Sequence, residues 1–399
     1  MSFALVFHVV ILFILLQTLA TIGVNFFLFR RPRRISGAAA DAPLISILVP
    51  ARNEETRLPG CLDSLLTQTY QNVEIIVLDD NSTDRTSSVA LERGFSRDAG
   101  STRRILSGEA LPAGWTGKGW ACHQLSHAAR GEYLLFTDAD TQHAPDCLSS
   151  AFAHADAERA DLLSAWPRQI TKTWSERLVI PLIGLLILGF MPHLFLWLPQ
   201  RYPALARRLP RQWLWGIGGA NGQFLLFRRA AYDAIGGHEA VRDHLVEDVA
   251  IARRVTQRIA DGLRLINCDG SHIVSCRMYE NLSGVWEGFT KNLRAAFDER
   301  LGMFLGFGLM QFVCFVLPFA MICLRQWMGP WWIYAVIEVV LVYFIRIILT
   351  LRLRTSWLSV VLHPFAQLFA LAIGCNSWRL SSGKGVQWKG RTYKMGETV

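Results

Sequence analysis

An uncharged apolar run from Phe3 to Phe29 constrains the fold of this chain more than any other part of the sequence. As a helix rising ~1.5 Å per residue, it is long enough to cross a hydrocarbon core of ~30 Å. A cleaved signal peptide has a shorter apolar core, and its positive charges precede that core. Here the basic sequence RRPRR begins at Arg30, so the positive-inside rule predicts an N-terminal transmembrane anchor over residues 1–29 and a cytosolic chain from residue 30.

Further apolar runs lie toward the end of the chain. Residues 301–324 and 330–350 predict a transmembrane hairpin, whereas residues 357–373 have basic flanks on both sides and predict a re-entrant or interfacial segment. We therefore expect membrane helices over residues 301–378 and a basic cytosolic tail over residues 379–399. The formal charge is +9, and basic residues cluster beside the apolar runs, so a membrane surface is the expected partner and a nucleic acid is not.

The sequence between residues 43 and 300 has a mixed composition and predicts one soluble α/β domain. Short β-branched runs at 45–49, 73–78 and 133–136 alternate with helical stretches, a pattern typical of a mostly parallel sheet. Residues 178–198 are apolar but rich in proline, and a single crossing there would place two acidic motifs on opposite sides of a membrane. We expect this segment to be interfacial or re-entrant. The eight cysteines form no CxxC pair, so neither a zinc site nor a disulfide framework is predicted.

Polar side chains follow each of the three predicted strands. Ligands of open α/β sheets bind at the carboxyl ends of strands, so Glu54, Asp80, Asp138 and Asp140, with Asn53 beside Glu54, predict one binding site. Two carboxylates two residues apart, as in Asp138-Ala139-Asp140, can share a divalent cation that also binds phosphate oxygens; an acidic turn is the alternative. Asp80 can accept hydrogen bonds from a base or a ribose, although capping of the next helix explains much of segment 79–84.

Two further segments carry groups suited to a diphosphate and to proton transfer. In GWTGKGW, a flexible glycine-rich turn is predicted to hold Lys118, whose charge suits binding of a diphosphate. An ordinary surface lysine is the alternative. Glu247 and Asp248 begin a predicted buried helix, where the helix dipole favours acidic residues, and a carboxylate there can also act as general base for transfer to a hydroxyl. The glycine cluster at 218–222 allows either close approach of the backbone to a ligand or a tight turn.

The tail carries a further candidate, the sequence QWKGR, with Gln387, Trp388 and Arg391. A tryptophan beside cations can stack on a sugar and neutralise a leaving diphosphate. A snorkelling anchor at the membrane surface explains the same residues equally well.

Six segments, in their order and spacing, resemble the motifs of the family-2 glycosyltransferases: LVPARNEE (48–55), VLDDNSTD (77–84), GWTGKGWA (114–121), FTDAD (136–140), GGANGQF (218–224) and VEDVAIARRV (246–255). This resemblance implies the GT-A fold, inverting transfer from a nucleotide sugar, and dependence on Mg²⁺ or Mn²⁺. It also implies a role for each candidate residue: Glu54 and Asp80 contact the nucleoside, Asn53 belongs to the donor site, Lys118 contacts the diphosphate, Asp138 contacts the ribose and diphosphate, Asp140 binds the metal, and Asp248 is the base with Glu247 beside it.

The anchor, the later helices and the segments RMYENLSGVWEGFTKN and QWKGRTY resemble the carotenoid- and hopanoid-associated glucosyltransferases, and more distantly ceramide glucosyltransferase. This resemblance implies UDP-glucose as donor and a membrane lipid or terpenoid as acceptor, in an integral protein of the bacterial cell membrane with a cytosolic catalytic domain. Processive polysaccharide synthases of the family carry QxxRW, whereas QWKGR lacks the following tryptophan, so we expect a single transfer. A processive synthase is the alternative. A non-enzymatic scaffold would have lost carboxylates that are all present here.

Overall fold

The computed structural model describes residues 3–37, 41–297, 300–327, 329–381, 386–388 and 391–393. The chain divides into two compact units. The first, here called the α/β unit, consists of Leu28–Ile170 and Leu194–Met278. The second, the helical unit, consists of the chain up to Phe27, Thr171–His193 and the chain from Tyr279. Residues 171–193 and 279–297, which the sequence predicts to be part of the soluble domain, thus group with the helices.

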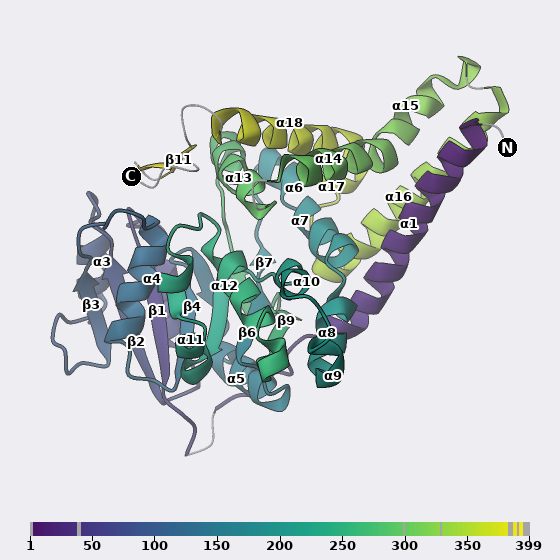
Figure 1. Ribbon diagram of the computed structural model, residues 1–399. Helices are drawn as coiled ribbons and strands as arrows, with labels where there is room; N and C mark the ends of the chain where they lie inside the picture. Colours follow the sequence, from purple (N-terminus) through teal and green to yellow (C-terminus); the bar gives the residue numbers. More distant parts are fainter. Residues whose placement is uncertain are drawn as a thin grey trace. The chain divides into compact units, whose positions relative to one another are not determined.

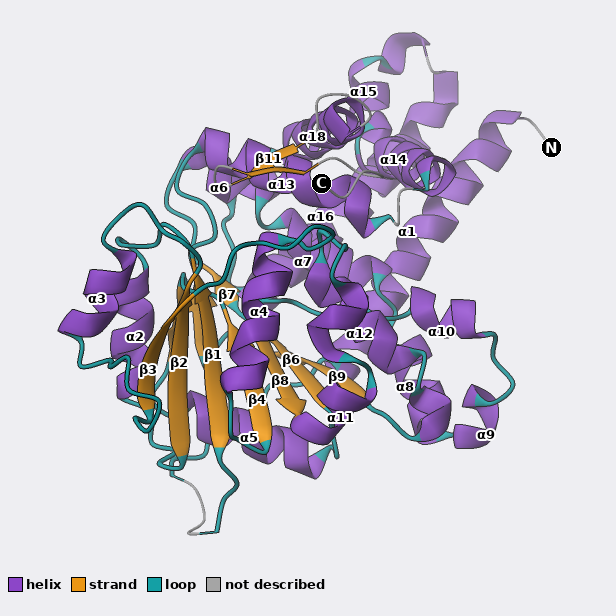
Figure 2. Ribbon diagram, turned by 60° about the vertical axis from the view of Figure 1, so that its left-hand side comes forward, coloured by secondary structure: helices purple, strands orange, loops and turns teal. Residues whose placement is uncertain are grey.

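A seven-stranded sheet forms the centre of the α/β unit, in the order β3-β2-β1-β4-β8-β6-β9 (Figure 2). The strands are β1 (Ile45–Ala51), β2 (Val73–Asp79), β3 (Arg103–Ser107), β4 (Tyr133–Thr137), β6 (Leu162–Trp166), β8 (Phe224–Arg228) and β9 (Leu265–Asp269). β1 to β4 are parallel, and β8 is antiparallel to both of its neighbours. A smaller sheet pairs β5 (Thr141–His143) and β7 (Arg168–Gln169) with β10 (Val274–Cys276). The three predicted strands are confirmed, each slightly longer than expected.

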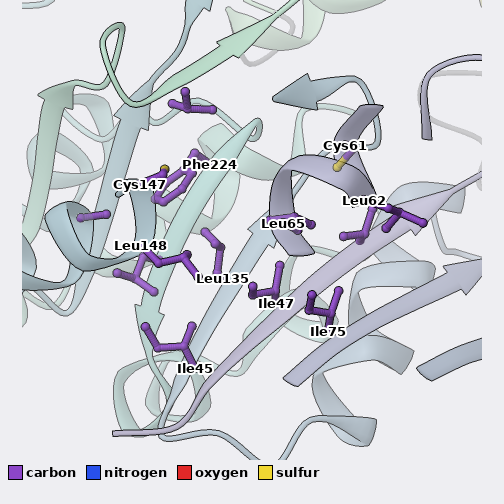
Figure 3. Close-up of a cluster of buried hydrophobic side chains, with 14 of the residues drawn as sticks. Ile45, Ile47, Cys61, Leu62, Leu65, Ile75, Leu135, Cys147, Leu148 and Phe224 are labelled. Carbon is purple, nitrogen blue, oxygen red and sulfur yellow. The ribbon is translucent and has the colours of Figure 1, made fainter. Parts of the chain in front are cut away.

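Helices cover both faces of this sheet, because alternate side chains of each strand point to opposite faces. Ile45, Ile47 and Val49 of β1 face a core formed with α2 (Leu58–Leu66), α3 (Thr86–Glu92) and α5 (Cys147–Ala157), part of which is drawn in Figure 3. Leu48 faces a second core formed with α4 (Gly117–Ala128), α11 (Arg229–Ala234) and α12 (Glu247–Thr256). The short helices α8 (His193–Arg201), α9 (Pro203–Ala206) and α10 (Arg211–Gly216) add to the second core.

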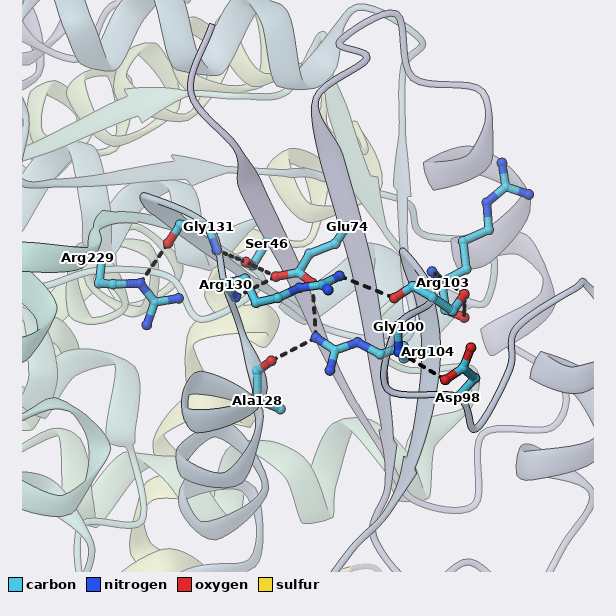
Figure 4. A network of polar contacts seen from close by, with 11 residues as sticks. Ser46, Glu74, Asp98, Gly100, Arg103, Arg104, Ala128, Arg130, Gly131 and Arg229 are labelled. Atoms are coloured by element: carbon cyan, nitrogen blue, oxygen red, sulfur yellow. Dashed lines mark hydrogen bonds and ion pairs between the residues drawn. The ribbon is translucent and has the colours of Figure 1, made fainter.

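A buried polar network holds the amino ends of the parallel strands together (Figure 4). The fully buried carboxylate of Glu74 accepts hydrogen bonds from Ser46 Oγ at 2.6 Å, Arg104 Nη2 at 2.9 Å and Arg130 Nε at 2.9 Å. Burial alone would raise the pKa of Glu74, but these donors and the nearby guanidinium groups hold that pKa below its ordinary value. This network fills the amino ends of the parallel strands. A ligand is therefore expected at their carboxyl ends, as in other open α/β sheets.

The helical unit contains the apolar segments (Figure 1). Its helices are α1 (Phe3–Leu28), α6 (Trp174–Val179), α7 (Leu182–Leu185), a π-helix (Leu186–Phe190), α13 (Leu282–Ala296), α14 (Leu301–Phe315), α15 (Leu317–Cys323), α16 (Trp332–Leu353), α17 (Leu358–Val361) and α18 (His363–Ser381). Among the described residues, three helical segments are long and apolar enough to cross a membrane: Phe3–Leu28, Leu301–Cys323 and Gly329–Leu353. Trp174–Phe190 together with His193–Arg201 would be a fourth, as a broken span or a re-entrant loop.

Buried polar side chains hold the helical unit together. α1 and α16 lie side by side, and His8 Nδ1 lies 2.8 Å from Glu338 Oε1 (Figure 1). The amide of Asn25, on α1, donates to the carbonyls of Leu188 and Met191, at 2.9 Å each, and its oxygen accepts from the backbone N–H of His193 at 3.0 Å. Inside a bilayer every backbone polar group needs a partner, so Asn25 satisfies groups that the interruption of this segment leaves without a helical bond. The re-entrant or interfacial path of residues 178–198 stays a prediction.

Candidate active site

One lysine joins three segments that are far apart in the sequence. Lys118 Nζ lies 2.7 Å from Asp138 Oδ1, at the end of β4, and 3.0 Å from Glu247 Oε1, at the start of α12. Burial lowers the pKa of Lys118, but the carboxylates of Asp138 and Glu247 raise it well above its ordinary value, so the side chain is a permanent cation. The prediction of a flexible turn around Lys118 is wrong in one respect: Lys118 lies in the first turn of α4, which begins at Gly117.

Asp248 lies in the first turn of α12, and backbone amides fix its carboxylate. Gly222 N donates to Asp248 Oδ2 at 2.7 Å, and Val249 N donates to Asp248 Oδ1 at 2.8 Å. Burial and the neighbouring Glu247 raise the pKa of Asp248 to about 6, against the opposing effect of Lys118. Asp248 is therefore a carboxylate near neutral pH and a stronger base than an ordinary aspartate.

The glycine cluster at 218–222 packs against α12. A Cβ on Gly222 would stand 2.9 Å from Asp248 Oδ2, and a Cβ on Gly218 would stand 2.6 Å from Arg253 Cα. Only glycine fits at these two positions without displacing the helix or the carboxylate. The backbone of Gly222 approaches Asp248 itself. The sequence does not reveal this contact, because the two residues are 26 positions apart.

Asp140 lies in an acidic environment suited to a cation. Burial is the largest cause of the rise in its pKa to about 7, followed by the charges of Asp138 and Glu54. Its Oδ1 is buried without a hydrogen-bond partner, and its only side-chain hydrogen bond that affects this pKa comes from the thiol of Cys276. A divalent cation would relieve both the repulsion and the unpaired oxygen, so the residues present fit an ion bound at Asp140.

The other donor-site candidates lie in the loops after β1 and β2. Glu54 and Asp80 are buried, at 7% and 4% exposure. Asn53 is exposed, and its Oδ1 accepts from Thr83 N at 2.9 Å while its own N–H donates to Ser82 Oγ at 3.0 Å. Asn53 thus ties the two loops together. The expected capping is also present: Asp84 Oδ1 accepts from Thr86 N, the first residue of α3, at 2.9 Å.

Uncharged polar side chains form hydrogen bonds around the FTDAD segment (136–140). Thr141 Oγ1 donates to the carbonyl of Asp138 at 2.7 Å, and Thr137 Oγ1 lies 3.1 Å from His143 Nε2. Burial lowers the pKa of His143 to about 3, so this imidazole is neutral. The sequence gives no signal for this role of His143, which lies on β5, a strand that pairs with β10, more than 130 residues further along the chain.

Gln387, Trp388 and Arg391 belong to a β-hairpin, with β11 (Val386–Trp388) antiparallel to β12 (Arg391–Tyr393). The side chains of these three residues, and Lys389 and Gly390 entirely, lie outside the part of the chain that the structure describes. Their expected role in the donor site stays a prediction.

Comparison with known proteins gives one consistent result. Residues 46–236 match the glycosyl transferase family 2 profile, and residues 206–398 match the glycosyl transferase family 21 profile. The chain is 27% identical over 360 residues to the 4,4'-diaponeurosporenoate glycosyltransferase of Staphylococcus aureus (strain MRSA252), and 26% identical over 367 residues to that of strain NCTC 8325 / PS 47. Each alignment covers 88% of this chain and 88% of the relative.

The fold is shared with a solved structure, a mannosyltransferase from Pyrobaculum calidifontis in complex with GDP-Man and Mn²⁺. The TM-score is 0.50 at 15% identity, and the match covers 93% of this chain and 99% of the other. A match of that extent reaches beyond the α/β unit into the helical unit. Residues 46–236 therefore form a glycosyltransferase domain of family 2 with a GT-A-like α/β fold, and the chain carries apolar helices long enough to cross a membrane both before and after its α/β unit.

Proposed function

We propose that this protein transfers one hexose, glucose from UDP-glucose, to a membrane lipid or terpenoid with inversion at the anomeric carbon. The observation that carries the proposal is the contact of Lys118 with both Asp138 and Glu247, next to the backbone-fixed carboxylate of Asp248. The cation Lys118 thus contacts Glu247, the residue that directly precedes the proposed base Asp248. Transfer to a hydroxyl needs such a pair, because negative charge develops on the leaving group while the acceptor loses a proton.

The donor would lie at the carboxyl ends of β1, β2 and β4. Glu54 and Asp80 contact the nucleoside and Asp138 the ribose in this proposal, while Lys118 exchanges its carboxylate partners for the diphosphate. A divalent ion, Mg²⁺ or Mn²⁺, held by Asp140 would neutralise charge on the departing diphosphate. Within the described residues no group of three or more His, Cys, Asp or Glu could hold a metal ion, so such an ion would depend on the donor for further ligands.

Asp248 would act on the acceptor. The acceptor oxygen forms a bond to the anomeric carbon, the bond from that carbon to the diphosphate oxygen breaks, and Asp248 takes the hydroxyl proton. Its raised pKa matches this task at neutral pH. An acceptor carboxylate would arrive without its proton, and Asp248 would then position the acceptor without accepting a proton.

The membrane helices and the relatives support an apolar acceptor. The relatives in Staphylococcus aureus are named for 4,4'-diaponeurosporenoate, and the apolar segments provide a route for a bilayer molecule. We propose an integral protein of the bacterial cell membrane with its GT-A domain, over residues 43–300, in the cytosol. The mannosyltransferase of similar fold binds GDP-Man, so GDP-mannose is the second donor to test.

The test uses membranes that contain the wild type, Asp248→Asn or the matched control Asp243→Asn, whose carboxylate is 63% exposed. Each is given labelled UDP-glucose or GDP-mannose, a total lipid extract and either Mn²⁺ or EDTA. We expect one labelled lipid with UDP-glucose, dependent on Mn²⁺, retained in Asp243→Asn and reduced at least 100-fold in Asp248→Asn. A long water-soluble polymer would instead support the processive synthase, and equal activity of Asp248→Asn would refute the assignment of the base.

A further inference from the structure

The α/β unit contains a cavity of about 550 Å³ whose lining residues come from α9, α10, α11, α12 and their connections. None of the residues of the candidate active site lines it. Four arginines do: Arg207, Arg211, Arg254 and Arg258. Asp261 is the one acidic residue among the lining residues.

Two of these arginines are fixed in place. Arg254 Nη2 donates to the carbonyl of Ile235 at 3.1 Å, and Arg258 donates to the carbonyl of Ala234, so both bind the carboxyl end of α11. Arg258 Nε also donates to Asp261 Oδ2 at 3.0 Å. Arg207 and Arg211 are exposed and carry no acidic partner among the ion pairs of the described residues. The cavity thus has an excess of positive charge, and guanidinium groups match the geometry of phosphate oxygens.

The surface beside this cavity is apolar. α8, α9 and α10 bury Leu196, Ala206 and Leu214 in the second core of the α/β unit. The same segment also exposes aromatic and aliphatic side chains to the outside: Phe195, Trp197, Tyr202, Leu205 and Trp213, at 37–53% exposure. Residues 194–216 include four arginines and no acidic residue. Aromatic side chains mixed with arginine are typical of segments at the interface between a membrane and water.

We propose that this cavity binds the phosphate of an anionic lipid headgroup, with the aromatic side chains of α8 and α10 at the level of the headgroups. The charge of the cavity selects the phosphate, and the exposed apolar side chains beside it select a lipid over a soluble phosphate. Residues 194–216 also begin within the second half of the bent apolar pair Trp174–Phe190 and His193–Arg201, so they continue a membrane-type segment. The site is separate from the sugar-transfer site and does not depend on the function proposed for it.

The experiment measures ligand binding by the purified full-length chain in a neutral detergent, through its thermal unfolding midpoint and tryptophan fluorescence. The probes are dioctanoyl phosphatidylglycerol, dioctanoyl phosphatidylcholine and inorganic phosphate. The test variant is Arg207→Gln with Arg211→Gln. The matched control is Arg201→Gln with Arg208→Gln, which removes two exposed arginines of the same segment that do not line the cavity. All four residues are exposed, so both variants should fold.

We expect the anionic lipid to bind the wild type more tightly than phosphatidylcholine and to raise its unfolding midpoint. At about a fivefold contribution per arginine near an anionic headgroup, the test variant should bind about 25-fold more weakly, while the control stays close to wild type. Equal weakening in both variants would overturn the proposal, because it would show a general charge effect. Binding of inorganic phosphate as tight as that of phosphatidylglycerol would also overturn it, in favour of a soluble ligand.

Discussion

Gly222 controls the position of the proposed base through its own backbone. Its N–H donates to Asp248 Oδ2 at 2.7 Å, and a Cβ at this position would stand 2.9 Å from the same oxygen. We expect Gly222→Ala to lower kcat by about 10- to 100-fold with little change in KM for the nucleotide sugar, because displacing a catalytic group by ~1 Å has an effect of this size. Steady-state kinetics check this. Gly216→Ala is the control, since a Cβ there meets no atom within 4 Å.

The raised pKa of Asp248 sets a pH dependence. A carboxylic acid with a pKa of about 6 is protonated below that pH and cannot accept a proton, so kcat/KM should fall about tenfold per pH unit below pH 6 and level off above pH 7. A profile measured from pH 5 to pH 8 would show this limb in the wild type and not in Asp248→Asn. An acid limb retained by Asp248→Asn would mean that another group accepts the proton.

At the level of single residues, the sequence predicts which side chains lie close together better than it predicts which contacts fix them in place. Lys118, Asp138, Glu247 and Asp248 come from motifs, and the structure brings them together. The hydrogen bond from Cys276 to Asp140 is invisible in the sequence, because it exists only when β10 pairs with β5. Contacts of this kind depend on tertiary packing, for which local patterns carry no signal.

The first turn of α4 shows how packing overrides local preference at the scale of an element. Glycine disfavours helices, so GWTGKGW predicts a turn, yet α4 begins at Gly117 and includes Gly119. A Cβ on Gly119 would stand 2.7 Å from Thr116 Oγ1, so a larger residue would disturb the start of the helix. By contrast β1, β2 and β4 are confirmed almost to the residue, because their apolar runs are buried on both faces and bounded by polar residues.

Asn25 gives a prediction about the elements of the helical unit. Its amide is the partner of two carbonyls and one N–H around the interruption between the π-helix and α8. Asn25→Leu would leave these buried groups without a partner and should cost about 1–3 kcal/mol, lowering the thermal unfolding midpoint by roughly 2–6 °C. The matched control is Gln17→Leu, a polar residue on an exposed face of α1, which should leave the midpoint unchanged. Equal midpoints for Asn25→Leu and Gln17→Leu would contradict this role of Asn25.

Across the whole molecule, the positive-inside rule and three candidate spans together predict a topology. With Arg30 in the cytosol, the segment Leu301–Cys323 leaves the cytosol and Gly329–Leu353 returns to it, where Arg352 follows. The connection between these two segments, which includes residues 324–327, is then expected to be accessible from outside. The order of the motifs along the sequence cannot reveal this, since it depends on the sidedness of the membrane.

Cysteine labelling in a bacterial host tests this topology. Cys323 and Cys375 are the exposed cysteines of the described chain and are replaced by Ser, while the six buried ones stay. In this background, Gln326→Cys lies in the predicted external turn and Ala99→Cys lies on the exposed surface of the α/β unit. A membrane-impermeant maleimide should label Gln326→Cys in intact spheroplasts, and should label Ala99→Cys only after lysis. The reverse pattern would place the α/β unit outside, where cytosolic nucleotide sugars cannot reach it, and would contradict both the orientation and the proposed donor supply.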